Sequence, residues 1–362
     1  MKRGKQVKSK FKTIMLFLLM LFLIGIIVIF GMAMYSDIME SDTTNIIVAN
    51  TAGSIKEDDT TNNSNNSSKT IEIQANTQFF YNQLTEVQKS LYDGLMKNKE
   101  NMMNGTYQIE YGTAFSDILK EENGKEKLGD DYQSAVEAFL YDNPDVFYID
   151  ANKLYLTVET TNRLFKKTSN VFIGPKENSN YYVDGFNTTE QVRTAMSKIN
   201  EKKEEVLKKL TNNTYRNVLK IHDYLIDTID YDQNNTSIGS YSVYGALVDK
   251  KCVCEGYAKS LKYLLNAANI PCIIVQGIAT NSTGRSESHA WNCVYVNNEW
   301  YYIDATWNDP IIIGKGTIAK SIQYKYFLKG SKTMNKDHTL VYKFSDNGKT
   351  FWYPKVSETD YK

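Results

Sequence analysis

The sequence predicts an α+β fold that follows an apolar N-terminal segment and a polar linker. Apolar residues recur at helical spacing in several stretches between residues 79 and 229. Strand-like runs rich in aromatic and β-branched residues cluster between residues 272 and 305, directly after a helix that is expected to begin near Cys254. The 362 residues, 42% of them apolar, are enough for one large or two modest domains with a real core.

Charge and composition narrow the function classes. The 42 basic and 42 acidic side chains balance, which argues against a protein that binds nucleic acid by neutralising phosphates. The first 13 residues carry six basic groups and no acid, so the remainder is mildly acidic. Because the chain has three histidines, a site that needs an imidazole has few candidates.

The N-terminus predicts a membrane anchor. Residues 14–34 are 21 uncharged, mostly apolar residues, and about 20 such residues span a bilayer as a helix. The preceding basic segment, residues 1–13, is expected to stay in the cytoplasm, which places the C-terminal domain outside the cell membrane. A cleaved signal peptide is the alternative, with Gly31-Met32-Ala33 as a small-x-small cleavage site. An uncleaved anchor is favoured because the apolar run exceeds the usual signal-peptide length.

Residues 35–75 are predicted to be a disordered linker. The stretch KEDDTTNNSNNSSKT at residues 56–70 is almost entirely polar and cannot bury enough apolar surface to offset the entropy of ordering. The exported part is then divided into an α+β region, residues 76–200, and a second domain, residues 201–362.

The region 76–200 predicts helices and strands with clear boundaries. A first helix is expected near Thr85-Glu86-Val87-Gln88, which resembles a capping box. A second helix is expected to end before Asn143-Pro144. Residues 147–149 and 154–158 read as strands, since they are rich in aromatic and β-branched residues.

Two further helices are expected between residues 188 and 229. Thr188-Thr189-Glu190-Gln191 is a second capping box that opens a long amphipathic helix. The next helix carries His222 on or beside its apolar stripe. We therefore expect His222 to be a hydrogen-bonded structural residue.

Residues 241–310 contain the residue types that carry chemistry. A helix is expected from about Cys254 to Asn269, followed by a buried strand at 272–278 and a polar loop at 280–288. Residues 290–296 and 299–305 then form a hairpin around the turn Asn297-Asn298. A cysteine at a helix N-terminus lies among unpaired N–H donors, which favour thiolate over thiol.

The hairpin register predicts a histidine–carboxylate contact. If Val296 faces Glu299 across the turn, then Asp304 becomes the diagonal neighbour of His289 on the same face. A carboxylate beside an imidazole fixes its tautomer, and the imidazole can in turn deprotonate a nearby thiol. A slip of one residue would place the two side chains on opposite faces.

Five motifs occur in order along the chain. They are Cys-Val-Cys254-Glu-Gly-Tyr-Ala, Ile270-Pro-Cys, Val275-Gln-Gly277, His289-Ala-Trp-Asn292 and Trp300-Tyr-Tyr-Ile-Asp304-Ala-Thr-Trp-Asn-Asp309. Together they resemble the transglutaminase-like (transglutaminase/protease) superfamily in its bacterial membrane-anchored type. Weaker matches are Ile221-His-Asp-Tyr-Leu225 with Tyr231-Asp232, and Tyr326-Phe-Leu328 with His338. The resemblance implies a papain-like core in which the helix that bears the cysteine packs on an antiparallel sheet.

The resemblance also implies roles for individual residues. Cys254 is the expected nucleophile, His289 the general base and acid, and Asp304 the orienting carboxylate. Trp291 and Trp307 are expected to border the site and bind substrate, and the backbone N–H of Cys254 to stabilise an oxyanion. No metal or organic cofactor is implied.

Several of these residues also have a simpler interpretation. Cys254 is alternatively a buried thiol, and Cys252 is a rival nucleophile that would lie outside the helix. Cys272 and Cys293 are expected to be free buried thiols on strands. A zinc site is disfavoured, because no CxxC…CxxC or HxxxH spacing occurs. His338 is interpreted as a surface or structural residue.

The sequence therefore predicts a membrane-tethered cysteine enzyme that acts outside the cell on amide bonds through a thioester. Water as the acceptor would make it a protease or amidase, and an amine would make it a transglutaminase; hydrolysis is the simpler expectation. Expected partners are protein or peptide substrates at the cell surface or wall, and not nucleic acid. The alternatives are a non-catalytic surface-binding or scaffold module with the same fold and an amidase that acts on peptide-linked glycans.

Overall fold

The computed structural model describes residue 15, residues 20–30, residue 32 and residues 41–47, 78–163, 166–310 and 318–362. The helices are α2 (Glu86–Lys97), α3 (Gly124–Asp142), α4 (Thr189–Leu207), α5 (Thr214–Thr228), α6 (Cys254–Ala267), α7 (Lys320–Gln323) and α8 (Ser331–Met334). The strands are β1 (Ser41–Ile47), β2 (Ile109–Gly112), β3 (Tyr155–Arg163), β4 (Lys166–Gly174), β5 (Asp230–Tyr231), β6 (Lys251–Cys252), β7 (Cys272–Thr280), β8 (Ser286–Val296), β9 (Glu299–Ile303) and β10 (His338–Leu340). The predicted α+β class is confirmed.

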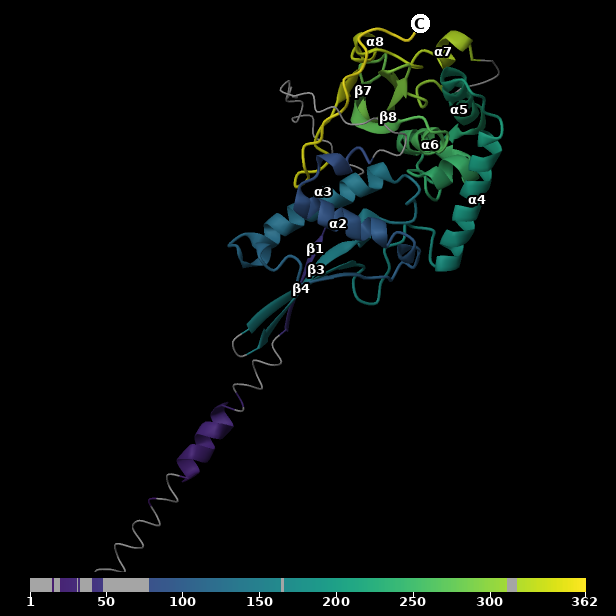
Figure 1. Cartoon of the computed structure of the whole chain (residues 1–362). Coiled ribbons are helices and arrows are strands. Elements are labelled where there is room, and N and C mark those ends of the chain that lie inside the picture. The colour runs from purple at the N-terminus through teal and green to yellow at the C-terminus, as the bar shows by residue number, and fades with distance from the viewer. Residues whose placement is uncertain are drawn as a thin grey trace, which may run out of the picture.

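The N-terminal region combines a helix pair with an antiparallel sheet. Helices α2 and α3 pack against each other and lie beside the sheet, whose strand order is β1-β3-β4-β2 (Figure 1). The capping box of α2 is confirmed, since Thr85 accepts from the Gln88 N–H and the Gln88 side chain accepts from the Thr85 N–H. Helix α3 ends at Asp142, directly before Asn143-Pro144, as predicted.

The strand predicted at residues 147–149 is wrong. Within it, only Ile149 forms a β-bridge, with Tyr182. The rings of Phe147 and Tyr148 are buried and pack edge-to-face, and Phe147 also contacts the ring of Phe186. Aromatic burial, and not ladder pairing, therefore accounts for the β-like composition of this segment.

The structure also departs from the predicted linker 35–75. Ser41–Ile47 forms β1 and pairs antiparallel with β3 from Ser41↔Thr161 to Ile47↔Tyr155. This segment, SDTTNII, contains the β-branched residues that favour strands, whereas the polar stretch at residues 56–70 lies outside the described residues. The first part of the predicted linker therefore contains a strand of the N-terminal sheet.

The predicted anchor 14–34 is described in part. Residue 15, residues 20–30 and residue 32 are helical. Among the residues that the structure describes, no helix combines the length and apolar character needed to cross a membrane. The basic segment 1–13 lies outside the described residues.

The second half of the chain places one helix against one antiparallel sheet. The sheet has the order β10-β7-β8-β9, and α6 contacts both β7 and β8. Helix α4 begins with the predicted capping box of Thr188 and Gln191 and contacts α6, as does α5 (Figure 1). It crosses the predicted boundary at residue 200.

The two halves share one core. Phe344 and Phe351, from the C-terminal segment, contact the ring of Phe80 in the N-terminal region. Phe79 contacts Trp352 at a centroid distance of 4.9 Å. The C-terminal segment therefore joins the N-terminal helices to the sheet that bears the candidate site.

Candidate active site

Cys254 is the first residue of α6, as predicted. Val253 precedes the helix and provides no side-chain cap. The Gly256 N–H donates to Val253 O at 2.9 Å, whereas the N–H groups of Cys254 and Glu255 have no acceptor inside the helix. Cys254 is partly exposed, whereas the other three cysteines are buried free thiols. The helix therefore presents one accessible sulfur at its positive end.

A buried carboxylate holds the loop in front of this cysteine. Asp232 accepts from the Ser237 N–H at 2.8 Å and from the Ser240 hydroxyl. Burial raises the pKa of Asp232, but the hydrogen bonds from Ser240 and Ser237 outweigh it and hold the pKa well below its usual range. Ser240 O then accepts from the Val253 N–H at 3.0 Å, which fixes the point at which α6 begins.

Gly256 permits the close packing at this helix start. A Cβ at this position would lie 2.5 Å from Cys252 Cβ and 2.8 Å from Ser240 O. The glycine of the Cys-Glu-Gly motif therefore lets the segment that contains Cys252 lie against α6. Burial raises the pKa of Cys252 well above its ordinary value, which argues against Cys252 as the nucleophile.

The predicted hairpin register is confirmed. Asn297 and Asn298 both have positive φ, as the two-residue turn requires. The ladder runs from Val296↔Glu299 to Asn292↔Ile303, and Asp304 follows the last residue of β9. His289 and Asp304 therefore reach the same face.

His289 contacts both of the other predicted site residues. Its Nε2 lies 2.8 Å from Asp304 Oδ2, and Cys254 is close enough for its charge to raise the pKa of the imidazole. Asn292, on the same strand, donates to Ala258 O in α6 at 2.9 Å, which fixes β8 against the helix that bears the cysteine. The structure therefore joins His289 to Asp304 by a direct contact, and Cys254 lies within electrostatic reach of His289.

The pKa values of His289 and Asp304 are shifted by burial and by neighbouring charges. Burial disfavours the charged form of His289, but the charges of Asp304 and Cys254 raise its pKa well above the ordinary value. Burial alone would raise the pKa of Asp304, but the charge and hydrogen bond of His289, with those of His338, hold it well below its usual range. The site thus favours an ionised carboxylate beside a protonated imidazole.

Both predicted tryptophans contact His289. The Trp291 ring lies 6.0 Å from the His289 ring, and the Trp307 ring lies 5.5 Å from it, between centroids. Trp291 is 2% exposed, so it forms a wall behind the imidazole. Trp307 is partly exposed and borders the site from the loop after β9.

His338 is the residue whose position the sequence did not predict. It is buried, not on the surface, and its Nε2 lies 3.1 Å from the same Oδ2 of Asp304 that His289 contacts. The polar atoms of His289, Asp304 and His338 lie within 4.8 Å of one another, and we interpret them as a hydrogen-bonded cluster. Two features of the sequence point to His338: it is one of three histidines in the chain, and it directly follows an acid, Asp337.

His222 has the predicted structural role in packing. It is fully buried, its Nδ1 lies 3.0 Å from Asp223 Oδ1, and it accepts from Asn308 Nδ2 at 3.0 Å. Asn308 Oδ1 accepts from the Tyr326 N–H at 2.8 Å. This chain of contacts fixes the loop after Asp304.

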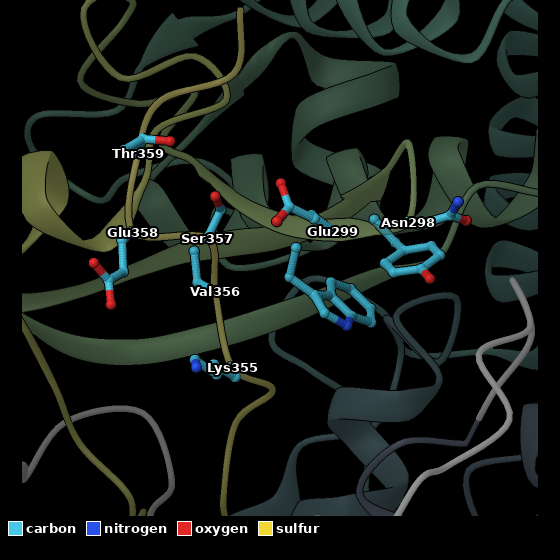
Figure 2. A pocket seen from close by; sticks show the side chains of 9 residues that line it. Asn298, Glu299, Lys355, Val356, Ser357, Glu358 and Thr359 are labelled. Carbon is cyan, nitrogen blue, oxygen red and sulfur yellow. The ribbon is translucent and has the colours of Figure 1, made fainter.

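A cavity of about 500 Å³ lies elsewhere, at the β8–β9 turn and the C-terminal segment. Figure 2 shows Asn298 and Glu299 on one side of it and residues 355–359 on the other. None of Cys254, His289 and Asp304 lines it. We therefore assign no part of the candidate site to this cavity.

Comparison with known proteins agrees with the motifs. The family model of the transglutaminase-like superfamily matches residues 201–305. Kyphoscoliosis peptidase of Mus musculus is 27% identical over 129 residues, which are 33% of this chain and 19% of that protein. The protein of the same name from Homo sapiens is 30% identical over 109 residues, which are 27% of this chain and 15% of that protein.

A solved structure of a TGase is 20% identical to this chain, with a TM-score of 0.29. The match covers 47% of this chain and 48% of the chain in that structure. The chain spans less than a fifth of the length of the two peptidases that it matches.

Proposed function

Residues 201–305 belong to the transglutaminase-like superfamily, and from this premise we propose that the protein is a cysteine enzyme that acts on amide bonds. Cys254 is the nucleophile, His289 the general base and acid, and Asp304 the carboxylate that orients His289. The observation that carries the proposal is the 2.8 Å contact between His289 Nε2 and Asp304 Oδ2, beside a partly exposed cysteine at a helix N-terminus.

The reaction follows from these positions. The sulfur of Cys254 attacks the carbonyl carbon of a carboxamide or peptide bond, and the oxygen becomes an anion that accepts from the Cys254 N–H. The protonated imidazole of His289 then donates its proton to the leaving nitrogen, so that an amine or ammonia departs and a thioester remains. Asp304, which cannot donate when ionised, keeps the Nε2–H of His289 in place.

The thioester is resolved by water or by an amine. In the first case His289 removes a proton from water and the product is a carboxylic acid, as for a protease, amidase or deamidase. In the second case a primary amine such as lysine takes the acyl group. Hydrolysis is the proposed outcome, since the cysteine is partly exposed and water has access to it. The two tryptophans that contact His289 are proposed to border the acyl-binding side of the site.

Mass spectrometry of the full chain after incubation with p-nitrophenyl acetate tests the nucleophile. We expect one acetyl adduct, on Cys254, and none in Cys254→Ala. The matched control is Cys252→Ala, which removes the neighbouring thiol and should be acetylated as the wild type is. His289→Asn should slow acetylation by about 100-fold or more. Equal acetylation rates in His289→Asn and wild type would refute an activated nucleophile.

The acceptor is tested with a glutaminyl peptide. Ammonia release without an adduct in the presence of hydroxylamine indicates hydrolysis, and hydroxamate formation indicates acyl transfer. Turnover of neither this peptide nor a library of peptide substrates, together with retained binding to cell-surface material by Cys254→Ala, would favour the scaffold alternative.

Attachment to the cell membrane is proposed as well. Supporting features are the uncharged segment 14–34 after six basic residues and the exposed apolar side chains within residues 20–30, such as Phe22 and Ile29. Immunoblotting of the full chain with an N-terminal tag, after alkaline extraction of membranes, tests this. Tagged protein in the membrane fraction supports the anchor, and loss of the tag from membrane-bound protein refutes it.

A further inference from the structure

The two ring nitrogens of the buried His338 each contact a carboxylate. Its Nε2 lies 3.1 Å from Asp304 Oδ2, and its Nδ1 lies 2.7 Å from Asp337 Oδ1. An ionised carboxylate accepts and does not donate. Asp304 Oδ2 therefore receives N–H groups from two histidines, one of which is the proposed catalytic base.

The sheet brings the two histidines together over a strand of small residues. His289 on β8 pairs with Gly277 on β7, and His338 on β10 pairs with Ala279 on the same strand. Residues two apart in a strand share one face, so both imidazoles project from the face that carries Gly277 and Ala279. Their ring centroids lie 5.8 Å apart, a distance that a large side chain on β7 would obstruct.

A second set of contacts holds His338 from behind. Asp337 Oδ2 accepts from the Tyr326 hydroxyl at 2.7 Å, and the Tyr326 backbone oxygen accepts from the Asp304 N–H at 3.0 Å. The ring of Trp307, which also contacts His289, lies 4.6 Å from the His338 ring between centroids, at an interplanar angle of 61°. The imidazole of His338 is thus fixed in orientation on both edges and one face.

We propose that His338 is a positioning residue for the candidate active site, and that it holds the Asp304 carboxylate in the rotamer that serves His289. This inference rests on the proposed function of Cys254, His289 and Asp304. His338 acts through Asp304 and does not touch the reacting sulfur. Without its N–H, Asp304 keeps the His289 donor on Oδ2 and the backbone N–H of Trp307 on Oδ1 at 3.1 Å, so the carboxylate is held by two donors instead of three.

Two amide substitutions separate positioning from packing, because each retains one of the two contacts. His338→Gln places an amide N–H near the position of Nε2 and keeps the donor to Asp304. His338→Asn places it near Nδ1 and keeps the donor to Asp337. If His338 only stabilises the fold, both variants lose one buried contact and behave alike.

Steady-state hydrolysis of p-nitrophenyl acetate by the full chain gives the first readout, with active sites titrated by alkylation of Cys254. We expect His338→Asn to lower kcat per titrated site by about 10- to 100-fold, the loss that is typical when a partner that orients a functional side chain is removed. KM should stay within about twofold of the wild-type value. His338→Gln should stay within about threefold of wild type. Equal kcat per site in the two variants would overturn the proposal.

Proton NMR of the imidazole N–H groups gives a second readout that needs no turnover. In wild type, two N–H protons that point at Asp304 should resonate far downfield, and His289→Asn identifies one by its loss. In His338→Asn we expect loss of the other and a shift of the His289 proton with faster exchange, whereas His338→Gln should retain the His289 signal. An unchanged His289 signal in His338→Asn would refute positioning, even if wild type shows no activity and the proposed function itself fails.

Discussion

Two fully buried carboxylates in this chain have opposite acidities. Asp304, beside the candidate nucleophile, has a pKa well below its usual range because the charge and hydrogen bond of His289, with those of His338, outweigh burial. Glu137, on α3 of the N-terminal region, has a pKa raised to about 7, because burial outweighs the opposing effects of the Ser345 and Gln133 side chains. The two carboxyl groups are equally buried, so the charged donors next to Asp304 account for the difference in their pKa values.

The two regions therefore use buried polar groups differently. The sheet β10-β7-β8-β9 places two imidazoles around one carboxylate, an arrangement that would serve the proposed proton transfer. In the N-terminal region, Glu137 accepts from Gln133 Nε2 at 2.8 Å, but its Oε2 has no aligned hydrogen-bond partner among the described residues. We expect substitutions at Asp304 to change the rate and substitutions at Glu137 to change stability.

The largest expected effect is that of Asp304→Asn. The amide cannot support a protonated His289, and its NH₂ group favours the wrong imidazole tautomer, so acetylation of Cys254 should slow by about ten-thousand-fold. Stopped-flow release of p-nitrophenolate measures this rate. Asp309→Asn is the matched control, since Asp309 accepts from the Tyr257 hydroxyl at 2.6 Å and does not contact His289. A similar rate loss in both variants would show that Asp304 has no special role.

The second expected effect is a pH-dependent stability change in Glu137→Gln. The pKa of Glu137 is raised from 4.5 to about 7 in the folded protein, so the folded state favours the protonated form. The stability that this form contributes is present below about pH 4.5 and is lost as the pH rises through about 7. An amide does not ionise, so Glu137→Gln should be more stable than wild type above pH 7, by up to about 3 kcal/mol.

Urea denaturation at about pH 4 and about pH 8 measures this difference. The two proteins should differ little at the lower pH and diverge at the higher. Glu126→Gln, an exposed change on the same helix, should be neutral at both. If Glu137→Gln shows no gain at the higher pH, then the folded protein accommodates the Glu137 charge and the contrast with Asp304 disappears.

Much of the candidate site followed from the sequence because its contacts are local or are fixed by a turn. Asn297-Asn298 determines the hairpin register, and that register places Asp304 near His289. The start of α6 at Cys254 followed from the apolar helical pattern. Each capping box, at Thr85 and at Thr188, joins residues three positions apart, so the local sequence motif was sufficient to predict it.

The sequence did not predict the contacts that depend on strand order. His338 reaches Asp304 because β10 pairs with β7, and β10 is a three-residue strand that has little periodicity to detect. Lys262, on α6, is buried although it is a charged residue, and its Nζ donates to Cys272 O at 3.0 Å. Neither contact has a signature in sequence spacing, since each joins segments whose pairing is set by the whole fold.

A third prediction concerns Gly277 on β7, which pairs with His289 on β8. In Gly277→Ala, the new Cβ would lie 2.2 Å from Thr339 O on β10 and 2.3 Å from the Trp291 ring. Both neighbours are constrained, so we expect a loss of about 1–3 kcal/mol in the free energy of unfolding. Because β10 carries His338, kcat per titrated site should fall as well.

Thermal unfolding and p-nitrophenyl acetate hydrolysis together measure the effect of Gly277→Ala. Thr339→Ala, an exposed change on the same strand pair, should stay within about 0.5 kcal/mol of wild type and retain its rate. Full activity in Gly277→Ala would mean that the separation of β7 and β10 does not control the site.

The smallest expected effect is that of Thr188→Ala, at the start of the helix that leads from one region to the other. Thr188 accepts from the Gln191 N–H at 3.2 Å, and loss of this cap should cost about 1 kcal/mol. Helix α4 contacts α6 but contributes none of the proposed catalytic side chains, so the rate per titrated site should not change. Thr189→Ala, one residue later, tests whether the cap itself matters. A rate loss in Thr188→Ala with wild-type stability would show that α4 tunes the chemistry, and would remove the distinction between the region that stabilises and the region that reacts.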